Sequence, residues 1–197
     1  CHECRSCMLR QAYHCQPKVP VQEYPEVCAP MGRLHMDITG RLPKVSGGYE
    51  YILVIKDFHT KFVWLFAIPN KEAETIAGIL AKDIFKQFGP PEMLVSDRGT
   101  EFRNKVVSKL SDYYRVNRVC TTRFKPRANG FVENHNKTMK DQLYHYANVK
   151  HDDWDQYLHV IMQSYNTTVS AATGYTPFYA MFGREMKTPE MTGLEEE

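Results

Sequence analysis

The stretch YEYILVIKDFHTKFVWLFAIP, residues 49–69, decides the fold class because two apolar runs flank a polar turn. Both runs are rich in β-branched and aromatic residues, which favour strands, and DFHT between them has the composition of a turn. A third such run, GRLHMDITGRL at residues 32–42, comes before them and is separated from them by the turn signal SGG. We therefore expect an antiparallel three-stranded meander.

Helical and strand patterns alternate after the meander. KEAETIAGILAKDIFKQFG, residues 71–89, has large apolar residues at intervals of four and ends at a glycine before two prolines, which predicts an amphipathic helix. We expect two further strands at 92–97 and 116–122, and four further helices at 101–114, 128–147, 151–168 and 176–185. This order predicts an α/β fold with a five-stranded mixed sheet flanked by helices, in which the first and fourth strands are parallel neighbours.

The composition is that of a globular chain, with 197 residues of which 43% are hydrophobic. There is no apolar run of membrane-spanning length, and the polar, Cys-rich amino terminus lacks a signal core, so we expect a soluble, intracellular segment of a longer protein. Only Cys120 of the six cysteines lies beyond residue 28. A disulfide framework therefore cannot hold the main body together.

Positive charge gathers in residues 101–140, where ten Lys or Arg face three acids, a local +7 in a chain of net charge +2. Such a block indicates a polyanionic partner, although a solvated surface is the commoner explanation of a charge run. Within it, RFKPRANGFVENHNKTMK at residues 123–140 surrounds a single acid, Glu133, with basic residues.

Three carboxylates fall where the predicted layout would bring them together: Asp37 in the first strand, Asp97 at the end of the fourth, and Glu133 early in the long helix. Because three such groups repel one another, they either protonate or bind divalent cations. Oxygen ligands favour Mg²⁺ or Mn²⁺, and two such ions about 3.5–4 Å apart can catalyse phosphoryl transfer. The surrounding basic residues would then hold a nucleic-acid backbone.

Each of these acids also has a structural explanation. With 23 acids in the chain, some trio at these intervals is expected by chance. Asp97 could close a turn before a helix, and Glu133 with Lys137 could be an ordinary helix pair. We assign structural roles to two nearby acids, Asp57 in a hairpin turn and Glu101 in the first turn of a helix.

The helix predicted at 128–147 has two different faces. Its polar face, which we expect to bind, holds Glu133, Lys137, Lys140 and Tyr144. Its apolar stripe, which we expect to pack, holds Val132, Met139, Leu143 and Tyr146. Asn136 lies between them, where it could support Glu133 or touch a base or sugar.

Packing explains most of the remaining apolar and histidine positions. We expect one stripe to face the core or a dimer partner: Trp154, Tyr157, Ile161 and Tyr165. His35 shares a strand face with Asp37, and we interpret it as a core or supporting residue and not as a ligand.

Four strings resemble the catalytic core of gypsy-type long-terminal-repeat retrotransposon integrases: LHMDITG, VSDRGTEF, KPRANGFVENHNKTM and SYNTTVSAATGYTPFYAMFGREMKTP. The similarity runs from about Met31 to Pro189. It implies an RNase H-like fold and a polynucleotidyl transferase, with 3′-end processing and strand transfer as its two steps. Water first attacks a phosphodiester near the element's 3′ end, and the freed 3′-hydroxyl then attacks target DNA.

The resemblance also implies residue roles. Asp37, Asp97 and Glu133 match the family's metal-binding catalytic triad, and Lys137 and Lys140 match lysines that contact the element's DNA ends. The loop at 123–130 would offer phosphate contacts through Arg123, Lys125 and Arg127. Two positions depart from the family pattern, with Lys125 where His is common and Asn134 where Arg is common. Neither departure removes a metal ligand.

The resemblance divides the chain into residues 1–28, the remnant of a zinc-binding domain and a linker, residues 29–184, the catalytic core, and residues 185–197, a tail. Cys4 and Cys7 resemble the second half of a His-His-Cys-Cys zinc site. Cys1 and Cys4 have the same spacing, and His14 or Cys15 could also supply a ligand, so the pairing stays open. We expect structural Zn²⁺ in the full-length protein and an incomplete site in this stretch.

The implied partners are double-stranded DNA, both element ends and target, and further copies of the chain, at least a dimer, with no membrane. The implied location is the nucleus, and a cytoplasmic virus-like-particle stage is compatible with it. Two alternatives are a host-domesticated DNA-binding protein without catalysis and a cut-and-paste transposase on the same fold. Integrases and such transposases share their active-site chemistry, so the triad does not distinguish one from the other.

Overall fold

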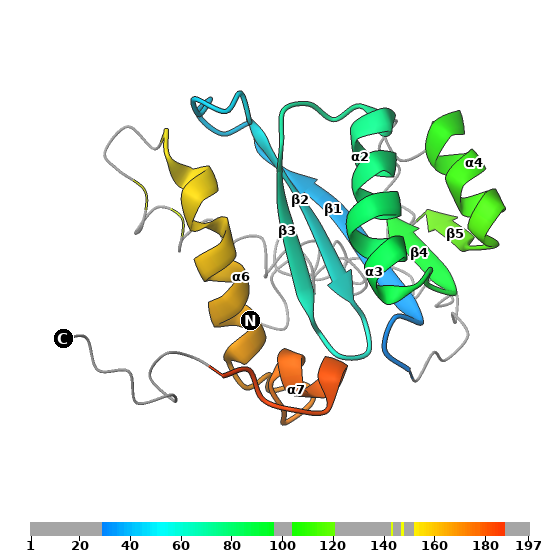
Figure 1. Ribbon diagram of the computed structural model, residues 1–197, viewed down its shortest axis with the longest axis vertical. Coiled ribbons are helices and arrows are strands. Elements are labelled where there is room, and N and C mark those ends of the chain that lie inside the picture. The colour runs from blue at the N-terminus through cyan, green and yellow to red at the C-terminus, as the bar shows by residue number, and fades with distance from the viewer. Residues whose placement is uncertain (1–28, 97–103, 121–142, 144–146, 148–151, 188–197) are drawn as a thin grey trace, which may run out of the picture.

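The computed structural model describes residues 29–96, 104–120, 143, 147 and 152–187. Within these residues, five strands form one sheet in the order β3-β2-β1-β4-β5. The strands are β1 (Arg33–Thr39), β2 (Tyr51–Asp57), β3 (Val63–Ile68), β4 (Met93–Ser96) and β5 (Asn117–Cys120). β1, β2 and β3 pair antiparallel as a meander, and β1 pairs parallel with β4, which pairs parallel with β5. The predicted mixed sheet is confirmed (Figure 1).

The hairpin between β2 and β3 is fixed by Asp57, which is fully buried. Its Oδ2 accepts hydrogen bonds from the backbone N of Thr60 at 2.8 Å and from Thr60 Oγ1 at 2.6 Å. Its backbone N donates to the carbonyl of Phe62 at 2.9 Å, which closes the turn. The structural role predicted for Asp57 is confirmed.

The helix predicted at 71–89 consists of three consecutive segments: α2 (Ala73–Ile79), the π-helix η1 (Leu80–Phe85) and α3 (Lys86–Phe88). The predicted amphipathic helix is confirmed, and its middle segment is π-helical. In a π-helix the hydrogen bonds run from i to i+5, and the apolar residues Leu80, Ile84 and Phe85 of this segment are buried. The helix ends at Gly89, at φ 84°, as the glycine signal predicts.

The other described helices are shorter than predicted, and two of them begin at a side-chain cap. α4 (Lys105–Tyr114) begins four residues after the expected Glu101, since the Asn104 side chain accepts from the backbone N of Val106 at 3.0 Å. Residues 152–167 begin with a 3-10 turn, η2 (Trp154–Tyr157), which continues as α6 (Leu158–Thr167). α7 (Pro177–Phe182) lies between the capping Thr176 and Gly183, at φ 69°.

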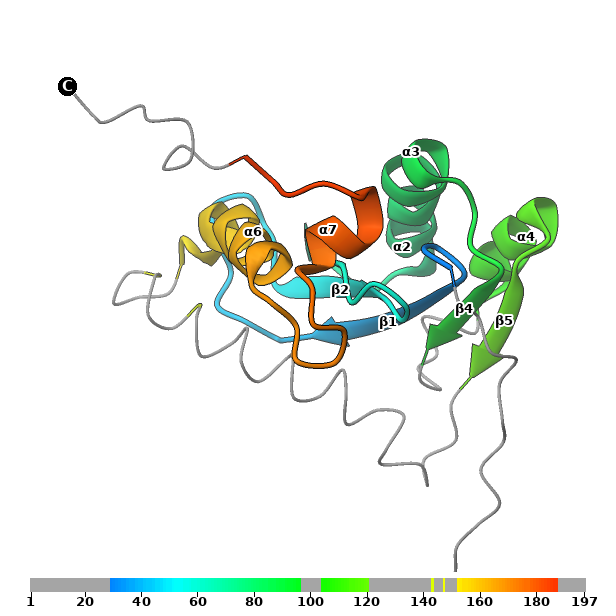
Figure 2. The ribbon, with the colours of Figure 1, turned by 90° about the horizontal axis from the view of Figure 1, so that it is seen from below.

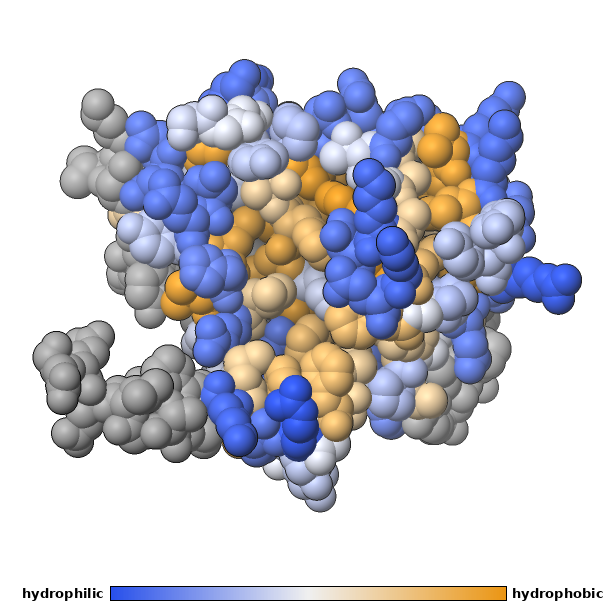
Figure 3. Space-filling model, viewed as in Figure 1, coloured by the Kyte–Doolittle hydropathy of each residue, from blue (hydrophilic) through white to orange (hydrophobic). Residues whose placement is uncertain are grey.

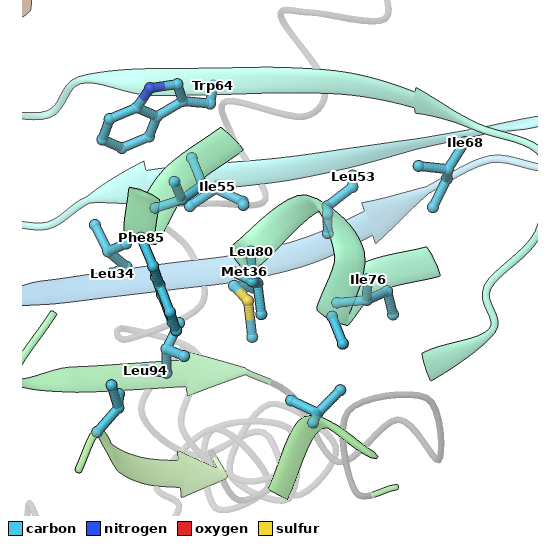
Figure 4. Close-up of a cluster of buried hydrophobic side chains, with 14 of the residues drawn as sticks. Leu34, Met36, Leu53, Ile55, Trp64, Ile68, Ile76, Leu80, Phe85 and Leu94 are labelled. Atoms are coloured by element: carbon cyan, nitrogen blue, oxygen red, sulfur yellow. The ribbon is translucent and has the colours of Figure 1, made fainter. Parts of the chain in front are cut away.

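Two apolar clusters cover the two faces of the sheet, and β2 supplies alternate residues to each. Leu53 and Ile55 belong to the cluster beneath α2 and η1 (Figure 4). Ile52 and Val54 point to the other face. This alternation along β2 is the period of two expected of a strand that is buried on both sides. This second cluster includes Leu143 and the apolar residues of η2 and α6.

The predicted packing stripes agree with this arrangement where they are described. Trp154 and Ile161 are buried, and Tyr157 and Tyr165 pack against the same cluster, so this stripe faces the core. Leu143 is 5% exposed, as its stripe requires. The backbone N of Ala147 donates to the carbonyl of Leu143 at 2.9 Å, a helical i to i−4 bond. None of the helices in the described part of the chain is long and apolar enough to cross a membrane.

Candidate active site

Asp37 lies on β1 opposite Val54 of β2. Its side chain is half-buried, and its Oδ1 accepts a hydrogen bond from the backbone N of Ile38 at 2.9 Å. Because side chains alternate along a strand, Asp37 shares its face of the sheet with His35 and Arg33. This is also the face of Val54, which belongs to the cluster that contains Leu143.

The register of β1 and β4 is what gives Asp37 its candidate role. Met36, the residue before Asp37, pairs in parallel with Ser96, the last described residue of β4. The residue that follows Ser96 in the sequence is Asp97. The parallel pairing of the first and fourth strands, on which the predicted triad depends, is therefore confirmed.

His35, the neighbour of Asp37 on this face, is a buried core residue with 8% of its surface exposed. Its ring stacks on Phe58, with centroids 5.5 Å apart. Burial lowers the pKa of His35 from 6.5 to about 4, and the positive charges of Arg33, Lys61 and Lys56 act in the same direction. The imidazole is therefore neutral near pH 7, as a core histidine would be.

Sequence reasoning missed a group of cations beside His35. The Arg33 guanidinium lies 3.6 Å from the centroid of the Phe58 ring, and the Lys61 Nζ lies 4.4 Å from it on a cation–π contact. Lys56, the cross-strand partner of His35, is only 2% exposed. Its Nζ donates to the Tyr165 hydroxyl at 2.6 Å.

Burial has opposite effects on the two groups of this last pair. It lowers the pKa of Lys56 from 10.5 to about 7 and raises the pKa of Tyr165 to about 12. One signal could have found Lys56 in the sequence: it follows Ile52 and Val54 at intervals of two, and this alternation directs its stem to the buried face. The Tyr165 partner, 109 residues away, has no such signal.

Residues 28–126, 99 of the 197 residues, match the family described as Integrase core domain. This chain belongs to the integrase core domain family. The resemblance seen in the four sequence strings is thereby confirmed at the level of the family.

Relatives of this integrase core domain are retroelement polyproteins. The chain is 29% identical over 158 residues to the retrovirus-related Pol polyprotein from transposon 412 of Drosophila melanogaster. It is 30% identical over 155 residues to the Pro-Pol polyprotein of simian foamy virus type 1. These alignments cover 80% and 79% of the chain but only 13% of each relative.

Solved integrase structures share the fold. The HTLV-2 integrase catalytic core domain, in complex with magnesium and in a trimeric form, matches with a TM-score of 0.63 at 19% identity, over 79% of this chain and 99% of that one. A simian T-cell lymphotropic virus intasome, in complex with PP2A regulatory subunit B56 gamma, matches with a TM-score of 0.67 at 16% identity, over 95% of this chain and 70% of that one. The expected RNase H-like fold is therefore confirmed.

Most of the predicted site residues of this integrase core domain lie outside the described residues. These are Asp97, Glu133, Asn136, Lys137, Lys140, Arg123, Lys125, Arg127, Cys4 and Cys7. Glu101 lies outside them too. Within the described residues there is no group of three or more His, Cys, Asp or Glu side chains that could hold a metal ion. The triad and the zinc ligands therefore stay predictions.

Proposed function

We propose that this chain is the catalytic core of a retroelement integrase that performs metal-dependent 3′-end processing and strand transfer on double-stranded DNA. The observation that carries the proposal is the parallel register of β1 and β4 in a chain of the integrase core domain family. In this register Met36 pairs with Ser96. Asp37 follows Met36 in the sequence, and Asp97 follows Ser96.

Covalent geometry supports a meeting of these two carboxylates. Neighbouring strands lie about 4.8 Å apart, and consecutive Cα atoms are about 3.8 Å apart. If the pairing of β1 with β4 continued for one more residue, Asp97 would lie opposite Asp37, with their Cα atoms about 4.8 Å apart. Two aspartate side chains at that separation could bind one cation together.

A second observation supports Glu133 as the third member. The cluster that contains Leu143 also contains Val54, the cross-strand partner of Asp37. A helix that packs Leu143 here lies on the face of the sheet to which Asp37 points. Glu133 is ten residues before Leu143, or about 15 Å along a helix axis, so this helix could present it beside β1 and β4.

The donor chemistry fits the expected metal. Asp37 offers a half-buried carboxylate, a hard oxygen ligand of the kind that Mg²⁺ and Mn²⁺ prefer. Asp37, Asp97 and Glu133 would hold two ions, which when bound polarise the reacting phosphate and activate the nucleophile. The hydrogen bond from Ile38 restricts how the Asp37 carboxylate can rotate. The HTLV-2 catalytic core, which shares this fold, is a complex with magnesium.

The other predicted residues would handle the DNA. Arg123, Lys125 and Arg127 would neutralise backbone phosphates, and Lys137 and Lys140 would position the element's ends, with Asn136 beside them. In the first step, water attacks a phosphodiester near the 3′ end, and the terminal nucleotides leave with the phosphate. In the second, the freed 3′-hydroxyl attacks a target phosphodiester, and the target's own 3′-oxygen leaves.

We further propose that the active form is a homo-oligomer, at least a dimer, because integration handles two DNA ends. Two structures of the same fold are described as a trimeric form and as an intasome. Cys4 and Cys7 would contribute to a structural zinc site in the full-length protein, and the reaction would take place in the nucleus.

A strand-transfer assay tests the proposed function. The full-length protein that contains this chain is given a recessed-end donor duplex and a target duplex, with Mg²⁺ or Mn²⁺. We expect joined products from the wild type and at least a hundredfold less from Glu133→Gln and Asp37→Asn, with thermal unfolding unchanged. Joining that survives both substitutions would refute the assigned residues. Excision of both donor strands without joining would favour a transposase, and normal cellular function of Glu133→Gln would favour a domesticated binding protein.

A further inference from the structure

The outer face of α4 carries an exposed row of residues that none of the proposed roles uses. Lys105, Lys109 and Tyr113 follow one another at intervals of four, and Arg115 comes directly after the helix. All four are exposed, and Tyr113 has 81% of its surface in solvent. We call these four residues the α4 stripe. At 100° per residue, Lys105, Lys109 and Tyr113 lie opposite the side of the helix that packs into the core.

Within the part of the chain that the structure describes, no acid forms an ion pair with the positive charges of the α4 stripe. Within the described residues, Lys105, Lys109 and Arg115 make no side-chain hydrogen bond or ion pair, whereas Arg41 and Glu50 form a salt bridge at 2.9 Å. Asp112 is the one acid on this face of the helix. Residues 104–118 hold four Lys or Arg against that acid, a local charge of +3.

Charge is distributed unevenly across the sheet. Residues 152–158, at the start of η2 and α6, hold three Asp and no Lys or Arg. Figure 1 shows α4 at one side of the molecule and α6 at the other. The outer edge at α4 is coloured as hydrophilic in Figure 3. A polyanion approaching this sheet would therefore be drawn toward the side of α4.

The α4 stripe is held on a rigid support. Val107, on the core side of α4, is fully buried, and Asn104 caps the first turn of the helix. The ring of Tyr113 meets that of Tyr114 edge to face at 5.0 Å, and Tyr114 meets Phe85 in the same way at 5.2 Å. Rigid aromatic contacts of this kind reduce the entropy lost when a surface binds a partner.

The position of α4 connects the stripe to the candidate active site. α4 joins β4 to β5, two parallel strands, so it runs back along the sheet from the end where β4 stops at Ser96. Lys105 is therefore on the Asp37 side of the molecule, and the stripe leads away from it. The two lysines are about 6 Å apart along the helix axis. One DNA strand presents a phosphate about every 3.4 Å along the duplex axis, so each lysine can reach a different phosphate.

We propose that the α4 stripe binds the phosphate backbone of double-stranded DNA next to the duplex segment that reacts. This inference rests on the proposed function, and it adds a DNA-binding surface outside the triad and its helix. The lysines and Arg115 neutralise phosphates, and the Tyr113 hydroxyl donates to a phosphate oxygen. The contact carries no sequence information, as suits DNA of arbitrary sequence.

The salt dependence of DNA binding tests the α4 stripe. Each neutralised phosphate contributes about 0.9 to the slope of log affinity against log salt. Lys105→Gln with Lys109→Gln should therefore lower the slope for a duplex of arbitrary sequence by about 1.8. The full-length protein and this variant are titrated with a fluorescent duplex, and anisotropy is followed from low to high salt.

The matched control is Lys82→Gln with Lys86→Gln. These lysines are also exposed, four residues apart and on a helical segment, and neither makes an ion pair within the described residues. The control removes the same charge, so we expect the wild-type slope to be kept.

Equal slopes for the wild type and for the variant at Lys105 and Lys109 would overturn the inference. A decrease in slope of the same size in the control variant would overturn it too. A larger loss with duplex RNA than with duplex DNA would also overturn it. Strand transfer by the wild type separates this result from the proposed function. If the wild type joins DNA and the slopes do not differ, only the α4 stripe is refuted. If the slopes differ and nothing is joined, only the catalytic proposal is refuted.

Discussion

Asn166 joins α6 to the edge strand of the sheet, and its replacement by Asp should destabilise the protein. Its Oδ1 accepts from the backbone N of Val63 at 2.9 Å, and its Nδ2 donates to the carbonyl of the same residue at 2.9 Å. Val63 begins β3, the outermost strand on its side. The Asn166 amide, 2% exposed, thus pairs with the edge strand as the peptide group of another strand would.

Asn166→Asp keeps the shape of the side chain and removes one donor. The acceptor bond to the Val63 nitrogen can persist, but a carboxylate oxygen now faces the Val63 carbonyl. Leaving one buried backbone group without its partner costs about 1–3 kcal/mol. For a chain of this size, each 1 kcal/mol lowers the melting temperature by about 2–4 °C. We therefore expect the melting temperature of Asn166→Asp to be lower than that of the wild type by at least about 2 °C and at most about 12 °C.

The pH dependence gives this prediction a second readout. Burial raises the pKa of the new carboxyl group in the folded state above its unfolded value. A group with a raised folded pKa contributes stability below the unfolded pKa and loses it as the pH rises. The protonated form can also donate to the Val63 carbonyl. The difference in free energy of unfolding between variant and wild type should therefore become smaller as the pH falls toward about 4.

Urea denaturation followed by tryptophan fluorescence measures the effect, since both tryptophans, Trp64 and Trp154, are buried. Asn104→Asp is the matched control. The Asn104 side chain only accepts a hydrogen bond, from Val106 N, so Asp can replace it and the stability should stay within about 0.5 kcal/mol. Wild-type stability of Asn166→Asp at pH 7 would refute the assigned role of the amide.

Two further predictions concern buried polar groups of β2. Lys56 has a folded pKa of about 7, below its ordinary 10.5, so its stabilising contribution is present above pH 10.5 and is lost as the pH falls toward 7. The urea midpoint of the wild type should therefore rise between pH 7 and about 10, and Lys56→Met should make this rise smaller. A rise of the same size in Lys56→Met would contradict the lowered pKa of Lys56. Asp57→Ala removes two hydrogen bonds to Thr60 and should cost about 2–4 kcal/mol, whereas Thr60→Ser, which keeps the hydroxyl, should cost under about 1 kcal/mol. Equal losses in the two variants would show that the turn does not depend on Asp57.

Local patterns in the sequence account for the elements and for part of the site. Runs rich in β-branched and aromatic residues, joined by turn signals, predict the meander. The order of strands and helices predicts the parallel neighbours β1 and β4, which the register of Met36 with Ser96 confirms. The turn role of Asp57 follows from its place after an apolar run and before Thr60. These features depend on residues close in the chain, so a periodic pattern or a turn composition is enough to predict them.

The tertiary structure decided the contacts that no local pattern contains. Asn166 and Val63 are 103 residues apart, and Lys56 and Tyr165 are 109 residues apart. The π-helical segment at Leu80–Phe85 has no local sequence signal either. In each case the sequence supplied the side chains. Which of these side chains meet was set by packing, because apolar burial does not depend on distance along the chain.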